Sequence, residues 1–501
     1  MTTHSDSSRN SPSEDAGSSG ATDVNALRPN SAVPNHVVAQ GIIANGPLLC
    51  MGAVMTSAAI YARGALPLAY LLGAILVWMW INTPLQFSKR LASSGGMFYF
   101  VTKGSGLGIG SIAGVSYAIY YTAFAAAGAV YFSVMAQSLL AQFRLPTGPE
   151  WIWAILPVGV LFIPGVLVYR GIRPSLRYGM VTGLAELVLM VVVSIVIVAL
   201  SGKANTARVF NPTLAHHGFA GVGIGMLLSA FSMSGSTATV YLGHEAHMAH
   251  RSIRRALLVS TTAVVVVFLL VSYAMTVGWG PAKMASFSGS NIPGLLIIGH
   301  FLGKPFELLT AVFMANSIFS AIVASTLVVS RVTHSMARAG VMPRGLSSVD
   351  RASGTPRAAV TTCLGLAAAG SVAASAIWNP NTAFIVLILV GTMGEFIGHI
   401  IGNLALPRFA TRSHIFRPAV HLLLPAASLI TTAIGVYYTV FPVSFPTAWG
   451  PILFGVGLLS FIGFLAIKKA RPLPSNSPGI AALGKELGIE LVVHEVAPKA
   501  G

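Results

Sequence analysis

Charged residues and cysteines are scarce in this 501-residue chain, and each shortage removes a class of protein. Charged residues make up 9% of the chain and hydrophobic residues 54%, which is too apolar for a soluble protein of this size. The two cysteines, Cys50 and Cys363, both fall inside apolar runs, so a disulfide framework and a thiolate metal site are excluded. The sequence also lacks the motifs of phosphate cradles, zinc sites and acyl-transfer triads. We therefore predict no enzyme, no metal and no organic cofactor.

Apolar runs dominate the chain instead, and each is about 20 residues long, enough to cross a bilayer. They predict an all-α polytopic membrane domain over residues 37–470 with about 12 spans. The candidate spans lie near 37–60, 66–87, 107–141, 151–169, 179–201, 218–243, 256–279, 306–333, 357–378, 383–405, 419–441 and 448–468. Residues 1–36 are rich in Ser, Asn, Asp, Gly and Pro, which predicts a disordered tail. Residues 471–501 form a second tail of unassigned role.

The net charge of +17 is better explained by membrane topology than by nucleic-acid binding. Basic residues stand singly between apolar spans and concentrate in every second loop. If the first span begins inside, the outside loops hold only Arg63, Arg144, Lys203, Arg208, Lys283 and Lys304. Since basic residues mark cytoplasmic loops, both termini are predicted to be cytoplasmic and the protein to lie in the cytoplasmic membrane.

The first span contains residues that break a helix. Gly41, Asn45, Gly46 and Pro47 stand within or beside its apolar run, where Pro removes a helical hydrogen bond and Gly weakens the helix. Unwound backbone at membrane depth is tolerated where it lines a cavity, and the freed N–H groups favour a carboxylate. A simple proline kink is the alternative.

A second interruption lies in the sixth span. Residues 232–237 read Ser-Met-Ser-Gly-Ser-Thr, a small polar patch between apolar flanks whose hydroxyls need partners away from water. Two interrupted spans that stand five apart indicate an inverted repeat around a midplane site.

Three stretches resemble motifs of the amino acid, polyamine and organocation permease superfamily. Residues 90–99 resemble its loop after the second span, residues 242–246 its Leu-Gly-Glu-Glu-Ala motif with His244 in place of the first Glu, and residues 336–344 its signature after the eighth span. The resemblance covers roughly residues 37–470. It implies the leucine-transporter fold, with two inverted repeats of five helices and two extra helices.

The resemblance also implies a substrate site at the two interruptions. The first would bind the substrate carboxylate through its backbone, and the sixth would face the amine and side chain. Tyr120 lies on an aromatic stripe of the third span, which borders the substrate cavity in relatives, although packing is the commoner role of such a stripe. The candidate substrate residues are Ile43, Ala44, Asn45, Gly46, Pro47, Met233, Ser234, Gly235, Ser236, Thr237 and Tyr120.

Glu186 lies inside the fifth span, where a charge in lipid is costly, so an acidic residue is a functional candidate. In relatives a lysine or glutamate near this position is linked to proton coupling, which makes Glu186 the candidate proton carrier. A protonated, hydrogen-bonded structural glutamate is the alternative. Ser325 and Thr326 in the eighth span resemble the family's sodium site, and ordinary packing of their hydroxyls is the alternative.

Further polar residues are candidates for a gate or relay. Glu395, His399 and Asn403 recur every four residues in the tenth span and share one helix face, which should line the pathway or contact another helix. Glu245 ends the sixth span and could close an inner gate by pairing with Arg331 or Arg338; an exposed ion pair of little energetic weight is the alternative.

Together these features predict a secondary active transporter that moves an amino acid or related amine by alternating access, with proton-coupled uptake. Sodium-coupled or exchange transport of a polyamine or other organocation is the alternative. A channel would need a continuous polar lining, and a membrane-embedded enzyme would need a nucleophile with its base. The expected partners are the small-molecule substrate and the lipid bilayer, without nucleic acid; the oligomeric state stays open.

Overall fold

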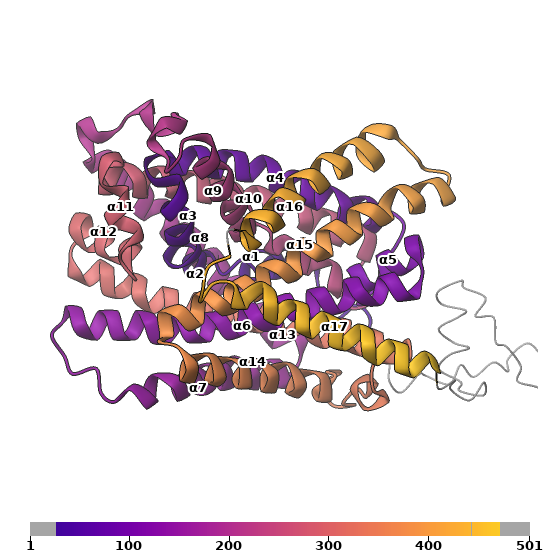
Figure 1. The fold of residues 1–501 in the computed structure, drawn as a ribbon. Coiled ribbons are helices and arrows are strands. Elements are labelled where there is room, and N and C mark those ends of the chain that lie inside the picture. The colour runs from indigo at the N-terminus through magenta and orange to yellow at the C-terminus, as the bar shows by residue number, and fades with distance from the viewer. Residues whose placement is uncertain (1–26, 442, 471–501) are drawn as a thin grey trace, which may run out of the picture.

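The computed structural model describes residues 27–470 apart from residue 442, and they form a bundle of long helices (Figure 1). Among these described residues, eleven helical stretches are long and apolar enough to cross a membrane. The first of these, Pro34–Ser88, is 55 residues long and therefore has room for two crossings of about 20 residues each. The predicted all-α polytopic class is confirmed. The predicted tails, up to residue 26 and from residue 471, lie outside the described residues.

The helices follow the chain in two successive sets of five spans. The first set comprises α1 (Pro34–Ile43) with α2 (Pro47–Gly52) and α3 (Val54–Ala62), then α4 (Leu66–Ser88), α6 (Leu107–Gln142), α7 (Glu150–Tyr169) and α8 (Ile172–Leu200). The second set comprises α9 (Phe219–Met233) with the 3-10 helix η5 (Gly235–Leu242), then α10 (Ala249–Trp279), α13 (Lys304–Arg338), α14 (Arg357–Ile377) and α15 (Pro380–Arg412). The extra helices are α16 (Leu424–Val440), which follows a π-helical turn at Ala419–Leu423, and α17 (Trp449–Ala470).

Both interruptions occur where the sequence predicted them. Helix α1 ends at Ile43, Gly46 takes the left-handed conformation with φ +53°, and Pro47 opens α2 at a position where its missing N–H costs nothing. Helix α9 ends at Met233, and after Ser234 the chain continues as the tighter η5. Each half of the bundle therefore begins with a broken span.

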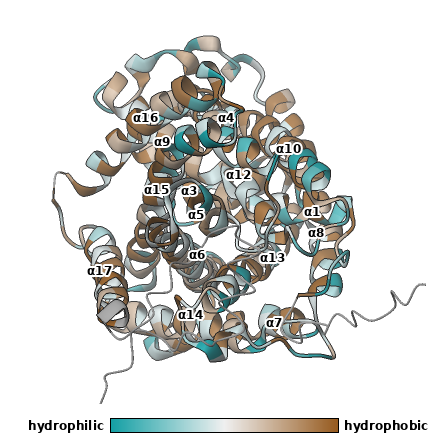
Figure 2. Cartoon of the chain, turned by 90° about the vertical axis from the view of Figure 1, so that its right-hand side faces the viewer, coloured by the Kyte–Doolittle hydropathy of each residue, from teal (hydrophilic) through white to brown (hydrophobic). Residues whose placement is uncertain are grey.

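The long helices pack in an inner group and a peripheral one. Helix α6 packs along α15 and α13 at the centre, while α7 packs against α14 and lies with it at one edge of the bundle in both views (Figures 1 and 2). Helices α16 and α17 pack against α15 from outside. Figure 2 shows hydrophobic residues along the outer helices, where Phe162, Val181 and Leu459 are exposed. Such an apolar outer surface fits a lipid environment.

Short helices that the sequence did not predict cap the ends of the bundle. Helix α5 (Met97–Ser105) lies at one end, and α11 (Met284–Ser288) and α12 (Pro293–Leu302) lie at the other (Figure 1). The stretch 90–99, predicted as a loop, is a loop only up to Gly96, because its last three residues open α5. At 5 to 10 residues these helices are too short to span a bilayer.

Candidate functional site

The two broken spans meet at their breaks. The side-chain Oδ1 of Asn45 accepts a hydrogen bond from the Gly235 backbone N–H at 2.8 Å, and its Nδ2 donates to the Gly41 carbonyl at 2.7 Å. A Cβ on Gly235 would lie 2.5 Å from the Asn45 nitrogen and 2.6 Å from the Ala44 carbonyl carbon. The two backbones touch at Gly235, so the residues predicted from separate sequence patterns form one cluster.

The backbone amides of the first break already have partners. Asn45 and Gly46 donate to the carbonyls of Ile42 and Ile43, at 3.1 and 2.9 Å. At the start of α2, the N–H groups of Leu48 and Leu49 donate to the Ser317 hydroxyl of α13 at 3.1 and 3.3 Å. A carboxylate bound here would take the place of Ser317 at the helix N-terminus. The carboxylate-binding role of residues 43–47 stays a prediction.

The sixth-span break is closed over by α6 and α10. The Tyr121 hydroxyl lies 3.2 Å from the Thr237 hydroxyl, and Thr261 of α10 donates to Ser236 at 2.7 Å. The Tyr120 ring packs edge-on against Phe231, with ring centroids 5.8 Å apart. Met233, Ser234, Ser236, Thr237 and Tyr120 are all buried, so this wall of the cluster faces no solvent.

Glu186 on α8 connects to the first break through α13. Its Oε1 accepts a hydrogen bond from Asn316 Nδ2 at 3.1 Å, and Asn316 Oδ1 accepts one from the Tyr178 hydroxyl at 2.7 Å. Ser317 and the backbone of Leu48 also lie within reach of the carboxyl, which is completely buried. Within the described residues, Glu186 Oε2 has no hydrogen-bond partner. The carboxyl therefore lies beside the amide-rich start of α2.

Glu245 and Arg331 form a buried, two-point ion pair. Arg331 Nε and Nη2 each donate to one carboxylate oxygen of Glu245 at 3.0 Å, and Nη1 donates to the Ser330 hydroxyl at 3.0 Å. Both side chains are at most 1% exposed, so the alternative of an exposed pair is wrong. Of the two arginines predicted as partners, Arg331 makes this contact; Arg338 lies two turns further, at the end of α13. A gating role for the pair stays a prediction.

The motif around Glu245 gathers segments that are distant in sequence. The His244 N–H donates to the Ser94 hydroxyl at 3.1 Å, and a Cβ on Gly243 would lie 2.2 Å from the Ser93 nitrogen. The Ala32 N–H donates to the Glu245 carbonyl at 2.8 Å. Residues 242–246 therefore contact the stretch 90–99, and Glu245 pairs with α13, at one end of the bundle.

The family model described as "Amino acid permease" matches residues 37–465, nearly the whole helical bundle. The chain belongs to the amino acid permease family. The chain is also similar to "Branched-chain amino acid permease BcaP" of Lactococcus lactis subsp. cremoris (strain MG1363), with 25% identity over 307 residues. That match covers 58% of this chain and 65% of the relative, a little under two thirds of its length. The family is one of permeases, which are embedded in membranes.

In this permease the polar face of the tenth span is buried between helices. His399 Nε2 lies 3.7 Å from Glu395 Oε1, and the His399 ring stacks on Trp80 of α4 with centroids 4.8 Å apart. Asn403 donates to the Ser428 hydroxyl of α16 at 2.8 Å and accepts from Thr83. The predicted shared face is confirmed as a helix contact. Both Glu395 oxygens lack hydrogen-bond partners within the described residues, and the gate or relay role stays a prediction.

The two hydroxyls of the candidate sodium site in this permease differ in their hydrogen bonding. The Thr326 hydroxyl donates to the Ile322 carbonyl of its own helix at 2.7 Å, which is ordinary behaviour in a membrane helix. The Ser325 hydroxyl is buried and has no hydrogen-bond partner in the described part of the chain. The Thr326 bond agrees with the packing alternative, and the sodium-site role of both residues stays a prediction.

Two residues beside Glu186 escaped the sequence-based prediction. Asn316 and Ser317 lie on α13 and contact the Glu186 carboxyl and the start of α2. An amide side chain in the middle of an apolar span was a usable signal for Asn316, because such groups form hydrogen bonds between helices. Ser317 gave no such signal, since hydroxyls are common in these spans and most bond to their own helix.

Proposed function

We propose that this permease is a secondary active transporter of neutral amino acids that uses Glu186 as its proton carrier. The contact of the two breaks, from Asn45 Oδ1 to the Gly235 N–H, is the observation that carries the proposal. It brings together the ends of four half-spans, and helix ends are where backbone amides and carbonyls become available to a zwitterion. Opening on either side of this point gives alternating access.

The lining of the second break supports a neutral substrate with an apolar side chain. Ser236 and Thr237 stand where a carboxylate would be needed to balance a second positive charge, and both are neutral. Tyr120, Phe124 and Phe231 form an aromatic cluster beside them, with centroids 5.8 to 6.2 Å apart. An aliphatic side chain packs well on such a surface. The printed name of the relative, a branched-chain amino acid permease, agrees with this choice.

Glu395 favours the alternative of a polyamine or another organocation. Its neighbour Gly394 packs on Tyr120, and Gly398, one turn on, packs on the Tyr117 ring. Glu395 is thus a buried carboxyl beside the tyrosines that border the second break. His399 lies beside this carboxyl, and an imidazolium there would balance the charge of Glu395 in place of a cationic substrate.

A cavity connected to Glu186 by hydrogen bonds supports proton coupling. Tyr178, Asn316 and Arg170 line a cavity of about 530 Å³ between α7, α8 and α13. Through Tyr178 and Asn316 this cavity reaches the Glu186 carboxyl by two hydrogen bonds. Protonation of Glu186 would change the hydrogen bonds of Ser317 and Leu48 at the first break, so proton binding and substrate binding share atoms. Sodium coupling through Ser325 and Thr326 is the second candidate.

The test is transport by purified protein in proteoliposomes. Radiolabelled leucine, valine, lysine and putrescine are offered separately, first with an imposed proton gradient and then with a sodium gradient at equal pH. We expect accumulation of leucine and valine with the proton gradient only, abolished by a protonophore. If putrescine accumulates and Glu395→Gln abolishes this, the substrate is an organocation rather than a neutral amino acid. If accumulation occurs with the sodium gradient alone, sodium is the coupling ion and Ser325 and Thr326 are the candidate site.

A further inference from the structure

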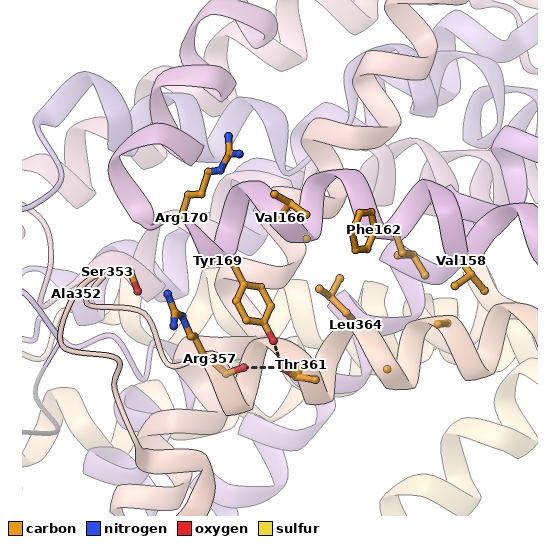
Figure 3. A pocket seen from close by; sticks show the side chains of 14 residues that line it. Val158, Phe162, Val166, Tyr169, Arg170, Ala352, Ser353, Arg357, Thr361 and Leu364 are labelled. Atoms are coloured by element: carbon orange, nitrogen blue, oxygen red, sulfur yellow. Dashed lines mark hydrogen bonds between the residues drawn. The ribbon is translucent and has the colours of Figure 1, made fainter.

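A long apolar groove lies between α7 and α14, away from the two breaks (Figure 3). Its volume is about 860 Å³, and Val158, Phe162, Val166 and Leu364 line its length. Glycine leaves the hollow open, since a Cβ on Gly365 would meet nothing within 4 Å. The groove opens outward, because Phe162 on one wall is 70% exposed.

One end of the groove is polar and basic. Arg170 and Tyr169 come from the end of α7, and Arg357 and Thr361 from the start of α14, and all four line this end of the groove. In Figure 3 the Arg357 side chain reaches toward α7, whereas the Arg170 side chain points away from α14. Arg357 lies over the Tyr169 ring and is 49% exposed. Arg170 is exposed, and no carboxylate pairs with it within the described residues.

Asp350 holds Arg357 at the groove end. Its Oδ1 lies 3.1 Å from Arg357 Nη1, and its Oδ2 accepts hydrogen bonds from the Ser353 N–H and hydroxyl at 2.8 Å. These bonds, with the nearby arginine, keep the pKa of Asp350 below its usual range, so it stays ionised. Asp350 pairs with Arg357 alone among the two groove arginines, so Arg170 leaves the groove end with a net positive charge.

The groove has the length of a lipid acyl chain in one leaflet. From Val158 to Tyr169 the helix rises about 16 Å at 1.5 Å per residue, close to half of the roughly 30 Å hydrocarbon core. The basic groups therefore stand where a headgroup would lie. Basic pockets between membrane helices are suited to anionic headgroups, and arginine binds phosphate through two parallel hydrogen bonds.

We propose that this groove binds an anionic phospholipid. One acyl chain lies along the apolar wall formed by Val158, Phe162 and Leu364, and the phosphate lies at the end of the groove that Arg170 and Arg357 line. The lipid ties α7 to α14 at their polar ends. Arg170 also lines the cavity of Tyr178 and Asn316 that is connected to Glu186, so the bound headgroup stands next to that cavity.

Native mass spectrometry of the detergent-purified full chain tests the proposal. Phosphatidylglycerol and phosphatidylcholine with identical acyl chains are added in turn, and the retained lipid is counted. We expect the wild type to retain phosphatidylglycerol preferentially. Two variants address the site: Arg170→Gln/Arg357→Gln removes the charge, and Gly365→Leu fills the apolar part. We expect affinity to fall roughly tenfold or more in the first, because each basic group near an anionic lipid contributes measurable attraction.

The control variant Arg408→Gln/Arg412→Gln removes the same charge from exposed positions on α15 and should retain lipid like the wild type. Gly365→Leu should lose lipid with both groove arginines intact. Equal retention of the two lipids, or wild-type retention in both groove variants, would overturn the proposal. So would a dimer that dissociates in Gly365→Leu without any bound lipid, because a second copy would then fill the groove. Binding is read without transport, so the result is independent of the proposed substrate.

Discussion

Arg331 is a guanidinium buried completely within the helix bundle, and its charge is tolerable there because Glu245 binds it at two points. Removing one partner leaves the other charge buried and uncompensated. We expect Arg331→Met to lower the free energy of unfolding by about 3–5 kcal/mol, and Glu245→Gln/Arg331→Met to recover much of this loss. Denaturant unfolding in mixed micelles measures both. Asp350→Asn, which removes a partly exposed pair, should cause little loss of stability. If Arg331→Met lowered the free energy of unfolding no more than Asp350→Asn does, the result would contradict the account.

The native cysteines provide a readout that a purely structural ion pair would not change. Cys50 is buried beside the first break, where its thiol donates to the Asn45 carbonyl at 2.9 Å. In a Cys363→Ala background only Cys50 can react with a thiol reagent. If the Glu245–Arg331 pair is a gate, Glu245→Gln/Arg331→Met exposes Cys50, and the thiol reagent labels Cys50 faster than in the parent protein. Unchanged labelling would leave the pair with a structural role alone.

At the scale of elements, the contact between the two broken spans depends on a glycine. The atoms that a Cβ on Gly235 would strike belong to the backbone of Ala44 and Asn45, which cannot turn aside as a side chain can. We expect Gly235→Ala to push the breaks apart and to reduce uptake by folded protein at least tenfold. A steric cost of about 1.4 kcal/mol in the transport-competent state is enough for a tenfold effect. Proteoliposome uptake measures the effect. Gly223→Ala on α9, where a Cβ meets nothing within 4 Å, should transport normally; similar losses in both variants would contradict this view.

The elements were predictable where the chain carries a local signal. Gly46, Pro47 and the run 232–237 interrupt apolar stretches, so their sequence alone located both breaks. Helix α5 was missed because its nine residues are too few for a periodic pattern to stand out. The contacts that other helices make with the site were harder to predict from the sequence. Ser317 reaches the start of α2 from another helix, and no local pattern specifies such a tertiary contact.

On the scale of the whole molecule, the breaks and the proton carrier form one connected system. The Glu186 carboxyl lies beside Ser317, Ser317 holds the start of α2, and the breaks join at Gly235. A change at any point reaches the others through direct contacts. This connection is the physical basis we propose for coupling, because a proton on Glu186 and a substrate carboxylate at α2 both act on Ser317.

The most direct test of this account compares Glu186→Gln with the wild type in two transport modes. A glutamine resembles a protonated glutamate in shape and hydrogen bonding but cannot release a proton. We expect the variant to lose leucine accumulation driven by a proton gradient, while exchange of internal for external leucine continues at near wild-type rate. Glu150→Gln, an exposed acid at the start of α7, should behave as wild type in both modes. Proton-driven accumulation in Glu186→Gln at the wild-type level would contradict the central claim.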